Sequence, residues 1–420
     1  MHLNLKSEFL KDALTLITGT SISQAIPILI TPVLTRLYLP EEYGLMGIYL
    51  GISLLLGILS TLSYQAAILL PENENEALSI LQLCIISSFL VSVFSAIVIL
   101  FLNHKVAGWM NAPELSTYLY LVPLSILSIG VNNAFTSWAN RLNLYKSISM
   151  SKIISAVSTP FFSIILGLFI NGPFGLFAGL IAGQLISPSI LIIHAYKRNG
   201  VIFHLNSKSE LIKSAKIYRD FPKYSLWADF INNFVNQLPI YMLSIYSGKN
   251  DVGHYNLSNR ILGMPITLIS TSIGQIFYQK ASNDYIQKGN CEELYIKTFK
   301  FLFLLSVIPF SILIIFGPGI FGLFFGKEWR EAGVYSQIMG LMFFFKFTVS
   351  PLSYMYYIAN RQKEDLIIHI YLILSTAFCF YIGHILFHNV LVMLRLFTLN
   401  FSTVYLFYLF RTYRLSKRRN

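Results

Sequence analysis

Twelve apolar stretches of similar length follow one another along the chain, each bounded by polar or turn-forming residues. A helix needs about 20 mostly apolar residues to cross the hydrocarbon layer of a membrane, and each stretch is of that order. The pattern therefore predicts about twelve membrane-spanning helices. Their expected positions are 13–35, 44–70, 79–102, 115–139, 149–170, 174–196, 225–246, 258–279, 299–321, 333–358, 366–386 and 389–410.

The composition agrees with this pattern. Of the 420 residues, 55% are apolar and only 12% are charged, whereas about 25% are charged in ordinary soluble domains. So many apolar residues fill roughly eleven or twelve spans and leave little chain for a soluble domain. We therefore expect an all-α membrane protein. No small-residue cleavage site follows the first apolar run, so we interpret that run as a retained span rather than a signal peptide.

Lysine and arginine are distributed unevenly among the connections between these spans. With the N-terminus placed inside the cell, the inner segments carry 23 of them and the outer loops only 6. Because cytoplasmic loops accumulate positive residues, both termini are predicted to be cytoplasmic. The same rule accounts for the net charge of +12, so we expect no nucleic-acid partner. Cys84, Cys291 and Cys379 lie far apart without metal or redox spacing and are interpreted as packing residues.

The longest inner connection lies midway along the chain and is its most basic loop. Within it, the segment Glu210–Arg219 has apolar residues at helical spacing beside a basic face. Such a helix either lies along the inner leaflet or forms a solvated linker. The predicted domains are an N-terminal six-helix lobe at 1–196, a cytoplasmic basic linker at 197–224 and a C-terminal six-helix lobe at 225–420.

A faint internal repeat supports two halves. Pro32–Tyr38, a short loop and Gly44 in the first half are similar to Pro239–Tyr246, a loop and Gly253 in the second. Two six-helix copies keep the same orientation, which is the parallel-repeat arrangement of transporters that rock two lobes around a central cavity.

Three short motifs carry a family resemblance. The first is Leu34–Gly44 (LTRLYLPEEYG), which joins the first two spans, the second is Ala67–Pro71 with acidic residues after it, and the third is Gly253–Arg260. With twelve spans and a basic central loop, the chain resembles the O-antigen and polysaccharide flippases of the Wzx type. These form the polysaccharide-transporter branch of the exporter superfamily (MOP) that also contains the multidrug MATE proteins. Gln65 departs from the pattern, because many relatives have an acidic residue there.

The resemblance implies a MATE-like fold of two six-helix lobes that open alternately to the two sides of a bacterial inner membrane. It implies a substrate of undecaprenyl-pyrophosphate-linked oligosaccharide, such as an O-antigen or capsule repeat unit, in contact with membrane lipids. A polysaccharide polymerase and a chain-length regulator are the candidate protein partners. We expect no cofactor. The chain has no Gly-rich ATP-binding loop, so direct ATP hydrolysis is not expected to drive transport. A proton or a sodium ion is the candidate coupling ion.

Two helix faces are polar enough to line a path for such a head group, whose hydrogen-bonding groups cost several kcal/mol each when unpaired in hydrocarbon. The residues of each face recur at steps of three and four, so they share one side of a helix. These polar residues either line the path or form hydrogen bonds between neighbouring spans. Span seven carries Asp229, Asn232, Asn233, Asn236 and Gln237, and span four carries Asn132, Asn133, Thr136, Ser137 and Asn140.

Lys346 lies near the middle of span ten among phenylalanines. A lysine there raises the free energy of membrane insertion by roughly 2.5–3.5 kcal/mol, so a functional role or a compensating partner is expected. Our hypothesis is that Lys346 attracts the pyrophosphate. The alternative is a structural ion pair, for which Asp229 is a candidate partner.

Other cations extend this predicted path. Arg36 and Arg260 occupy corresponding outer positions of the two halves, and Arg395 lies about two turns into span twelve. Arg141 and Lys152 flank an inner loop. Contact with substrate at the inner and outer mouths competes with anchoring at the membrane interface, where such side chains snorkel.

Two other functions compete with a flippase. A MATE-like cation-coupled drug or small-molecule antiporter would favour acidic residues in its cavity, and Asp229 is the carboxylate inside a predicted span. An enzyme would need a nucleophile, metal set or acid–base pair in an accessible loop, and none is recognisable. His384 and His388 are spaced to share a metal but have no third ligand nearby, so no metal site is expected.

Overall fold

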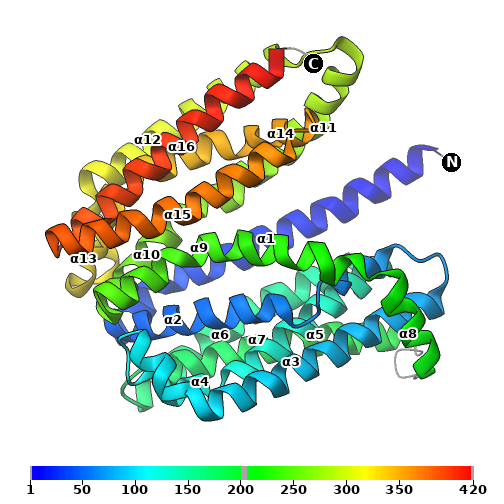
Figure 1. Cartoon of the computed structure of the whole chain (residues 1–420), viewed down its shortest axis with the longest axis horizontal. Coiled ribbons are helices and arrows are strands. Elements are labelled where there is room, and N and C mark those ends of the chain that lie inside the picture. Colours follow the sequence, from blue (N-terminus) through cyan, green and yellow to red (C-terminus); the bar gives the residue numbers. More distant parts are fainter. Residues whose placement is uncertain (1, 200–205, 418–420) are drawn as a thin grey trace. The chain divides into compact units, whose positions relative to one another are not determined.

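The computed structural model describes residues 2–199 and 206–417, with side chains for all of them except 2–14, 17 and 199. Every regular element in this part of the chain is a helix (Figure 1). Ten helical stretches of the described residues are long and apolar enough to span a membrane. Two further long helices, α1 (His2–Leu37) and α9 (Leu226–Tyr246), lie at the other two expected positions. The predicted all-α membrane fold with about twelve spans is confirmed.

The chain folds into two compact units, and neither is continuous in sequence. Unit 1 comprises Met1–Tyr38 and Leu45–Gln237, and unit 2 comprises Leu39–Gly44 and Leu238–Asn420. The boundaries after Gly44 and after Gln237 fall inside helices. Helix α2 (Pro40–Leu59) begins in unit 2 and continues in unit 1, whereas α9 begins in unit 1 and continues in unit 2.

Unit 1 is a bundle of long helices joined by short turns. Between α1 and α9 its elements are α2 from Leu45 onward, η1 (Tyr64–Leu69), α3 (Glu74–Trp109), α4 (Leu115–Leu119), α5 (Val122–Arg141), α6 (Tyr145–Phe169), α7 (Phe174–Asn199), α8 (Lys208–Ile217) and η3 (Phe221–Ser225). A core forms where η1, α3, α5 and α7 meet, with Ile68, Leu81, Cys84, Trp138 and Leu191 buried together. Cys84 is thus a packing residue, as predicted.

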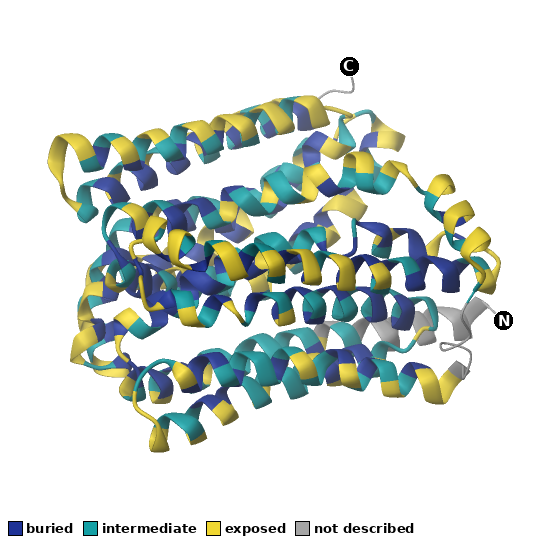
Figure 2. Ribbon diagram, turned by 60° about the horizontal axis from the view of Figure 1, so that its bottom comes forward, coloured by how far each residue is buried: buried dark blue, intermediate teal, exposed yellow. Residues whose placement is uncertain are grey.

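Unit 2 is also a bundle of helices joined by short turns. Its elements after α9 are α10 (Lys249–Pro265), η4 (Ile266–Ser270), α11 (Thr271–Lys288), α12 (Glu292–Phe325), η5 (Lys327–Trp329), α13 (Arg330–Val349), η6 (Ser350–Tyr354), α14 (Met355–Ile358), α15 (Gln362–Phe387) and α16 (Val390–Lys417). Figure 2 shows buried and exposed residues alternating along the helices. On α12, for example, Phe310 is buried whereas Leu304 and Ile308 are 70% and 69% exposed, as expected of a helix with one face toward lipid.

Several helix limits differ from the predicted spans. The expected helix 44–70 ends at Leu59, because Leu62 and Ser63 adopt left-handed backbone angles before η1 starts. The expected span 258–279 is one part of a longer helical run from Lys249 to Lys288. This run continues past Pro265 through the π-helical turn η4.

Helix starts follow local capping chemistry. Pro40 is the first residue of α2, where its missing N–H costs nothing, and the Leu39 backbone N–H donates to Glu42 Oε2 at 2.8 Å. Ser207 and Glu210 form a complete capping box at the start of α8. The amphipathic linker segment is helical, as both readings of it required.

The two glycines of the internal repeat meet inside unit 2. A Cβ atom added to Gly44 would lie 1.7 Å from the Lys249 carbonyl oxygen, and one added to Gly253 would lie 1.8 Å from the Pro40 carbonyl oxygen. The first turns of α2 and α10 therefore cross in backbone contact that only glycine allows. The reciprocity of the two contacts supports the sequence repeat.

Candidate functional site

The polar face predicted for span seven lies on α9. Asp229, Asn232 and Asn236 are exposed, and Asn233 and Gln237 are half-buried. Asn233 Nδ2 donates to the Asp229 carbonyl oxygen and Asn236 Nδ2 to the Asn232 carbonyl oxygen, both at 2.9 Å. Each amide nitrogen is thus engaged by its own helix. The side-chain carbonyl oxygens are the groups left to accept hydrogen bonds from hydroxyls.

Asp229 is held beside the turn that follows α2. Ser63 has a left-handed backbone (φ 59°), and its Oγ donates to Asp229 Oδ2 at 3.4 Å. Just before α9, the π-helical turn η3 contains Pro222 near its start. Membrane proteins often place polar sites where a helix is interrupted. Asp229 lies near two such interruptions, the turn at Ser63 and the π-helical turn η3.

The polar face predicted for span four lies on α5 and divides between two roles. Asn132 Oδ1 accepts a hydrogen bond from Ser187 Oγ on α7 at 2.8 Å. Nearer the start of α5, Ser125 Oγ donates to Gln184 Oε1 on α7 at 2.6 Å. This end of the face joins helices, as the alternative reading held. Asn133 and Asn140 are half-buried on the same helix and stay candidates for the path.

Lys346 is half-buried on α13 in unit 2. Its Nζ lies 5.7 Å from the centroid of the Phe343 ring, in a cation–π contact. Within the described part of unit 2, no Asp or Glu forms an ion pair with it. An ammonium in such surroundings can receive an anionic ligand.

Arg260 belongs to the helix that packs beside Lys346. The Phe343 ring lies 3.8 Å from the Cβ position of Gly263 on α10, and Arg260 precedes Gly263 by three residues, about one helical turn. The structure therefore brings Arg260 and Lys346 onto one pair of packed helices. Arg395 is exposed on α16, and Arg36 is exposed in the last turn of α1 in unit 1. These two lie on other elements.

Arg141 and Lys152 are engaged within unit 1. The Arg141 guanidinium donates to the Ile68 carbonyl oxygen at 3.1 Å and to the Glu72 carbonyl oxygen at 3.5 Å. Lys152 Nζ donates to Thr20 Oγ1 of α1 at 3.2 Å. Arg141 thus satisfies backbone acceptors around the end of η1, a role that sequence analysis did not foresee.

His384, near the end of α15, and His388, just after it, make ring contacts. His384 stacks on Tyr246 with ring centroids 4.6 Å apart, and His388 meets His384 edge to face at 5.4 Å. The part of the chain that the structure describes contains no group of three His, Cys, Asp or Glu able to hold a metal ion.

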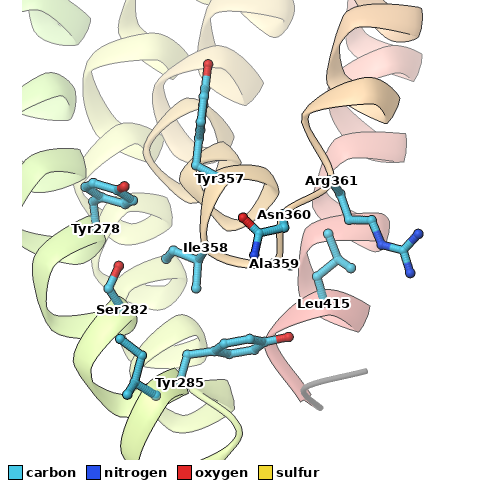
Figure 3. Close-up of a pocket in the computed structure, with 10 residues that line it drawn as sticks. Tyr278, Ser282, Tyr285, Tyr357, Ile358, Ala359, Asn360, Arg361 and Leu415 are labelled. Carbon is cyan, nitrogen blue, oxygen red and sulfur yellow. The ribbon is translucent and has the colours of Figure 1, made fainter.

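A cavity of about 550 Å³ in unit 2 was not predicted from the sequence. It lies between α11, the turn after α14 and the end of α16 (Figure 3). Its polar lining includes Tyr278, Ser282, Tyr285, Tyr357 and Asn360. No sequence signal joins these residues, because three separate elements contribute to the wall.

Residues 33–334 match the family described as "Polysaccharide biosynthesis protein". The chain belongs to this family. A curated relative of this polysaccharide biosynthesis protein is the succinoglycan biosynthesis transport protein ExoT of Rhizobium meliloti (strain 1021), 22% identical over 325 residues. The match covers 77% of this chain and 63% of the relative, so it spans less than two thirds of the relative's length.

Several solved structures share the fold. The lipid II flippase MurJ in an inward closed conformation has a TM-score of 0.75 at 15% identity, over 96% of this chain and 87% of that one. An inward-facing multidrug resistance MATE family transporter of the MOP superfamily has a TM-score of 0.62 at 14% identity, over 96% and 94%. A MOP superfamily transporter from Pyrococcus furiosus has a TM-score of 0.58 at 14% identity, over 97% and 96%. At these identities the likeness shows the fold, and the predicted MATE-like architecture is confirmed.

Proposed function

We propose that this polysaccharide biosynthesis protein is a flippase that moves an undecaprenyl-pyrophosphate-linked oligosaccharide, such as an O-antigen or capsule repeat unit, from the inner to the outer leaflet. The observation that carries the proposal is the family match over residues 33–334 in a chain with a multi-span transporter fold. Similarity to a succinoglycan biosynthesis transport protein and to the fold of a lipid II flippase supports it.

The physical task is to carry a polar head through hydrocarbon while its lipid tail stays in the membrane. Unpaired hydroxyls and phosphates would cost several kcal/mol each in a dry path. In this proposal the exposed face of α9 supplies acceptors for sugar hydroxyls, through Asp229 and through the amide oxygens of Asn233 and Asn236. Gln237 continues that face toward the unit boundary.

The anionic part of the head is assigned to unit 2. Lys346 supplies an ammonium that no described carboxylate of unit 2 neutralises, and Arg260 lies on the helix packed beside it. Charge-assisted contacts to phosphate oxygens are about twice as strong as neutral hydrogen bonds. These two cations are therefore the proposed pyrophosphate contacts, and Arg36 and Arg395 are proposed as contacts nearer the surface.

The proposal includes an orientation and an energy source. The asymmetry of lysine and arginine supports cytoplasmic termini in a bacterial inner membrane. Alternating access would be driven by a coupling proton or sodium ion, without a bound cofactor. The protein acts as a transporter rather than an enzyme, and it delivers its product to a polysaccharide polymerase and a chain-length regulator on the outer side.

Depletion of the protein in its own cells tests this function. Lipid-linked repeat units should accumulate in the inner leaflet, where a glycosidase added to intact spheroplasts cannot reach them, and re-expression should clear them. Normal turnover of these lipids would contradict a flippase. If depletion instead raised sensitivity to cationic drugs with no change in the glycolipids, a MATE-like antiporter would replace it.

A further inference from the structure

Three tyrosines line the cavity of unit 2, namely Tyr278, Tyr285 and Tyr357. The ring of Tyr354, which does not itself line the cavity, packs against two of them, with its centroid 5.1 Å from that of Tyr278 and 6.3 Å from that of Tyr357. Tyr278 and Tyr357 remain 42% and 49% exposed, so each still has ring surface to offer. Packed tyrosines give a ligand a flat apolar surface with hydroxyls at its edge, at little cost in side-chain entropy.

The side-chain amide of the cavity lining belongs to Asn360, just past the end of α14. Asn360 has a left-handed backbone with φ 55°. The Ala359 N–H donates to the Met355 carbonyl oxygen at 2.9 Å, and the Arg361 N–H donates to the Tyr356 carbonyl oxygen at 2.7 Å. Figure 3 shows the Asn360 amide directed toward the side of the cavity formed by α11, where Ser282 lies. The backbone that carries the amide is thus fixed by the end of the helix.

The charged residue among those that line the cavity is Arg361. Arg361 Nη1 lies 3.7 Å from Glu364 Oε1, and its guanidinium points away from the three labelled tyrosines (Figure 3). On α11, Lys288 Nζ lies 2.8 Å from Asp284 Oδ1. A site for phosphate would be expected to present an uncommitted cation. The hydroxyls and the amide suit a neutral ligand rich in hydroxyl groups.

We propose that this cavity binds a sugar residue of the transported glycolipid before its pyrophosphate engages Lys346. The assignment rests on the flippase function proposed above. A pyranose ring has an apolar C–H face that packs on an aromatic wall, and a rim of hydroxyls that reaches an amide and a serine. The volume of about 550 Å³ lies within the range of about 300–1,000 Å³ typical of small-molecule sites. It accommodates a mono- or disaccharide.

The position of the cavity matches an early step in transport. Its lining residues lie on α11 from Tyr278 to Ile286, in the turn at Asn360 and at the end of α16 at Leu415. These segments adjoin the basic connections 280–300, 361–363 and 411–419, which the charge asymmetry places in the cytoplasm. In the proposed orientation the cavity therefore lies on the side where the glycolipid is made.

Two variants test the cavity against matched controls. Asn360→Gly removes the amide but keeps the left-handed backbone, and Asn111→Gly makes the same change at an exposed left-handed position of unit 1. Tyr278→Ala removes part of the wall, and Tyr371→Ala removes a tyrosine of α15 with a similar exposed fraction, 53% against 42%. The probes are the lipid-linked repeat unit extracted from depleted cells, for transport in proteoliposomes, and the oligosaccharide released from it by mild acid, for binding to the purified protein.

Asn360→Gly and Tyr278→Ala should each weaken oligosaccharide binding about fivefold to tenfold, the equivalent of one net hydrogen bond, while both controls bind as wild type does. Transport at low glycolipid concentration should fall in parallel. If wild type transports the glycolipid and the cavity variants match their controls in both assays, the cavity assignment is wrong and the flippase function stands. A wild-type protein unable to transport it would overturn both. Inorganic pyrophosphate that displaced the oligosaccharide in wild type but not in Asn360→Gly would overturn the neutral-sugar assignment alone.

Discussion

Replacing Lys346 by methionine separates a role in transport from a role in stability. Methionine has a similar length and no charge. On insertion scales the lysine costs about 2.5–3.5 kcal/mol in mid-membrane, and a cation–π contact such as the one at 5.7 Å to Phe343 returns about 0.5–1 kcal/mol. We therefore expect Lys346→Met to stabilise the protein by about 2 kcal/mol and to raise its melting temperature.

The same change should impair transport. A charged hydrogen bond to phosphate contributes about 1.5–3 kcal/mol, so its loss should lower the apparent kcat/KM for glycolipid roughly tenfold to a hundredfold. Lys346→Arg keeps the charge and should retain most of the activity. A variant that gains stability and loses function is the expected signature of a residue kept for its ligand.

The assay combines thermal unfolding in detergent with glycolipid transport in proteoliposomes. Lys105→Met is a suitable control, because Lys105 is exposed near the end of α3 and its loss should change neither quantity. The opposite result would refute the reasoning. If Lys346→Met unfolded at a lower temperature and transported normally, the ammonium would be one half of a structural ion pair, whose disruption leaves an uncompensated buried charge.

Three further predictions concern other parts of the chain. Gly44→Ala should destabilise the protein by at least about 3 kcal/mol, because its Cβ would meet a backbone oxygen at 1.7 Å, whereas Gly108→Ala, with open space around it, should leave the melting temperature unchanged or raise it. Burial raises the pKa of the Cys291 thiol to about 12. A water-soluble maleimide should therefore leave Cys291 unmodified at about pH 8–9, where ordinary thiols ionise. A cysteine introduced by Asn111→Cys should be labelled at the same pH, and rapid labelling of Cys291 would contradict its burial. Asp229→Asn keeps an oxygen acceptor on α9, so glycolipid transport should persist in proteoliposomes, and its abolition would indicate coupling through that carboxylate.

Most of the fold could be predicted because one physical requirement dominates it. Hydrocarbon demands long apolar helices, so the hydropathy pattern located the spans and the charge asymmetry gave a predicted orientation. Helix limits were harder, because they depend on local geometry that hydropathy does not record. The left-handed turn at Leu62 and Ser63 ends a helix inside an apolar run, whereas the π-turn after Pro265 lets a helix continue.

The candidate site was predictable only where one helix carries the whole signal. The spacing from Asp229 to Gln237 was enough to place five polar residues on one face, and Lys346 stood out against its phenylalanine neighbours. Pairings between helices left no such trace. Nothing in the sequence joins Asn132 to Ser187, Arg141 to the carbonyl of Ile68, or Asn360 to the tyrosines of its cavity.

The interleaving of the two units bears on how the protein can be divided. A cut in the basic central loop would leave the first turn of α2 on one fragment and its partner Gly253 on the other. It would also place the unit 1 portion of α9 on the C-terminal fragment. Each half would then be made without a piece that completes it, so mature fragments should accumulate only when both are synthesised in the same cell.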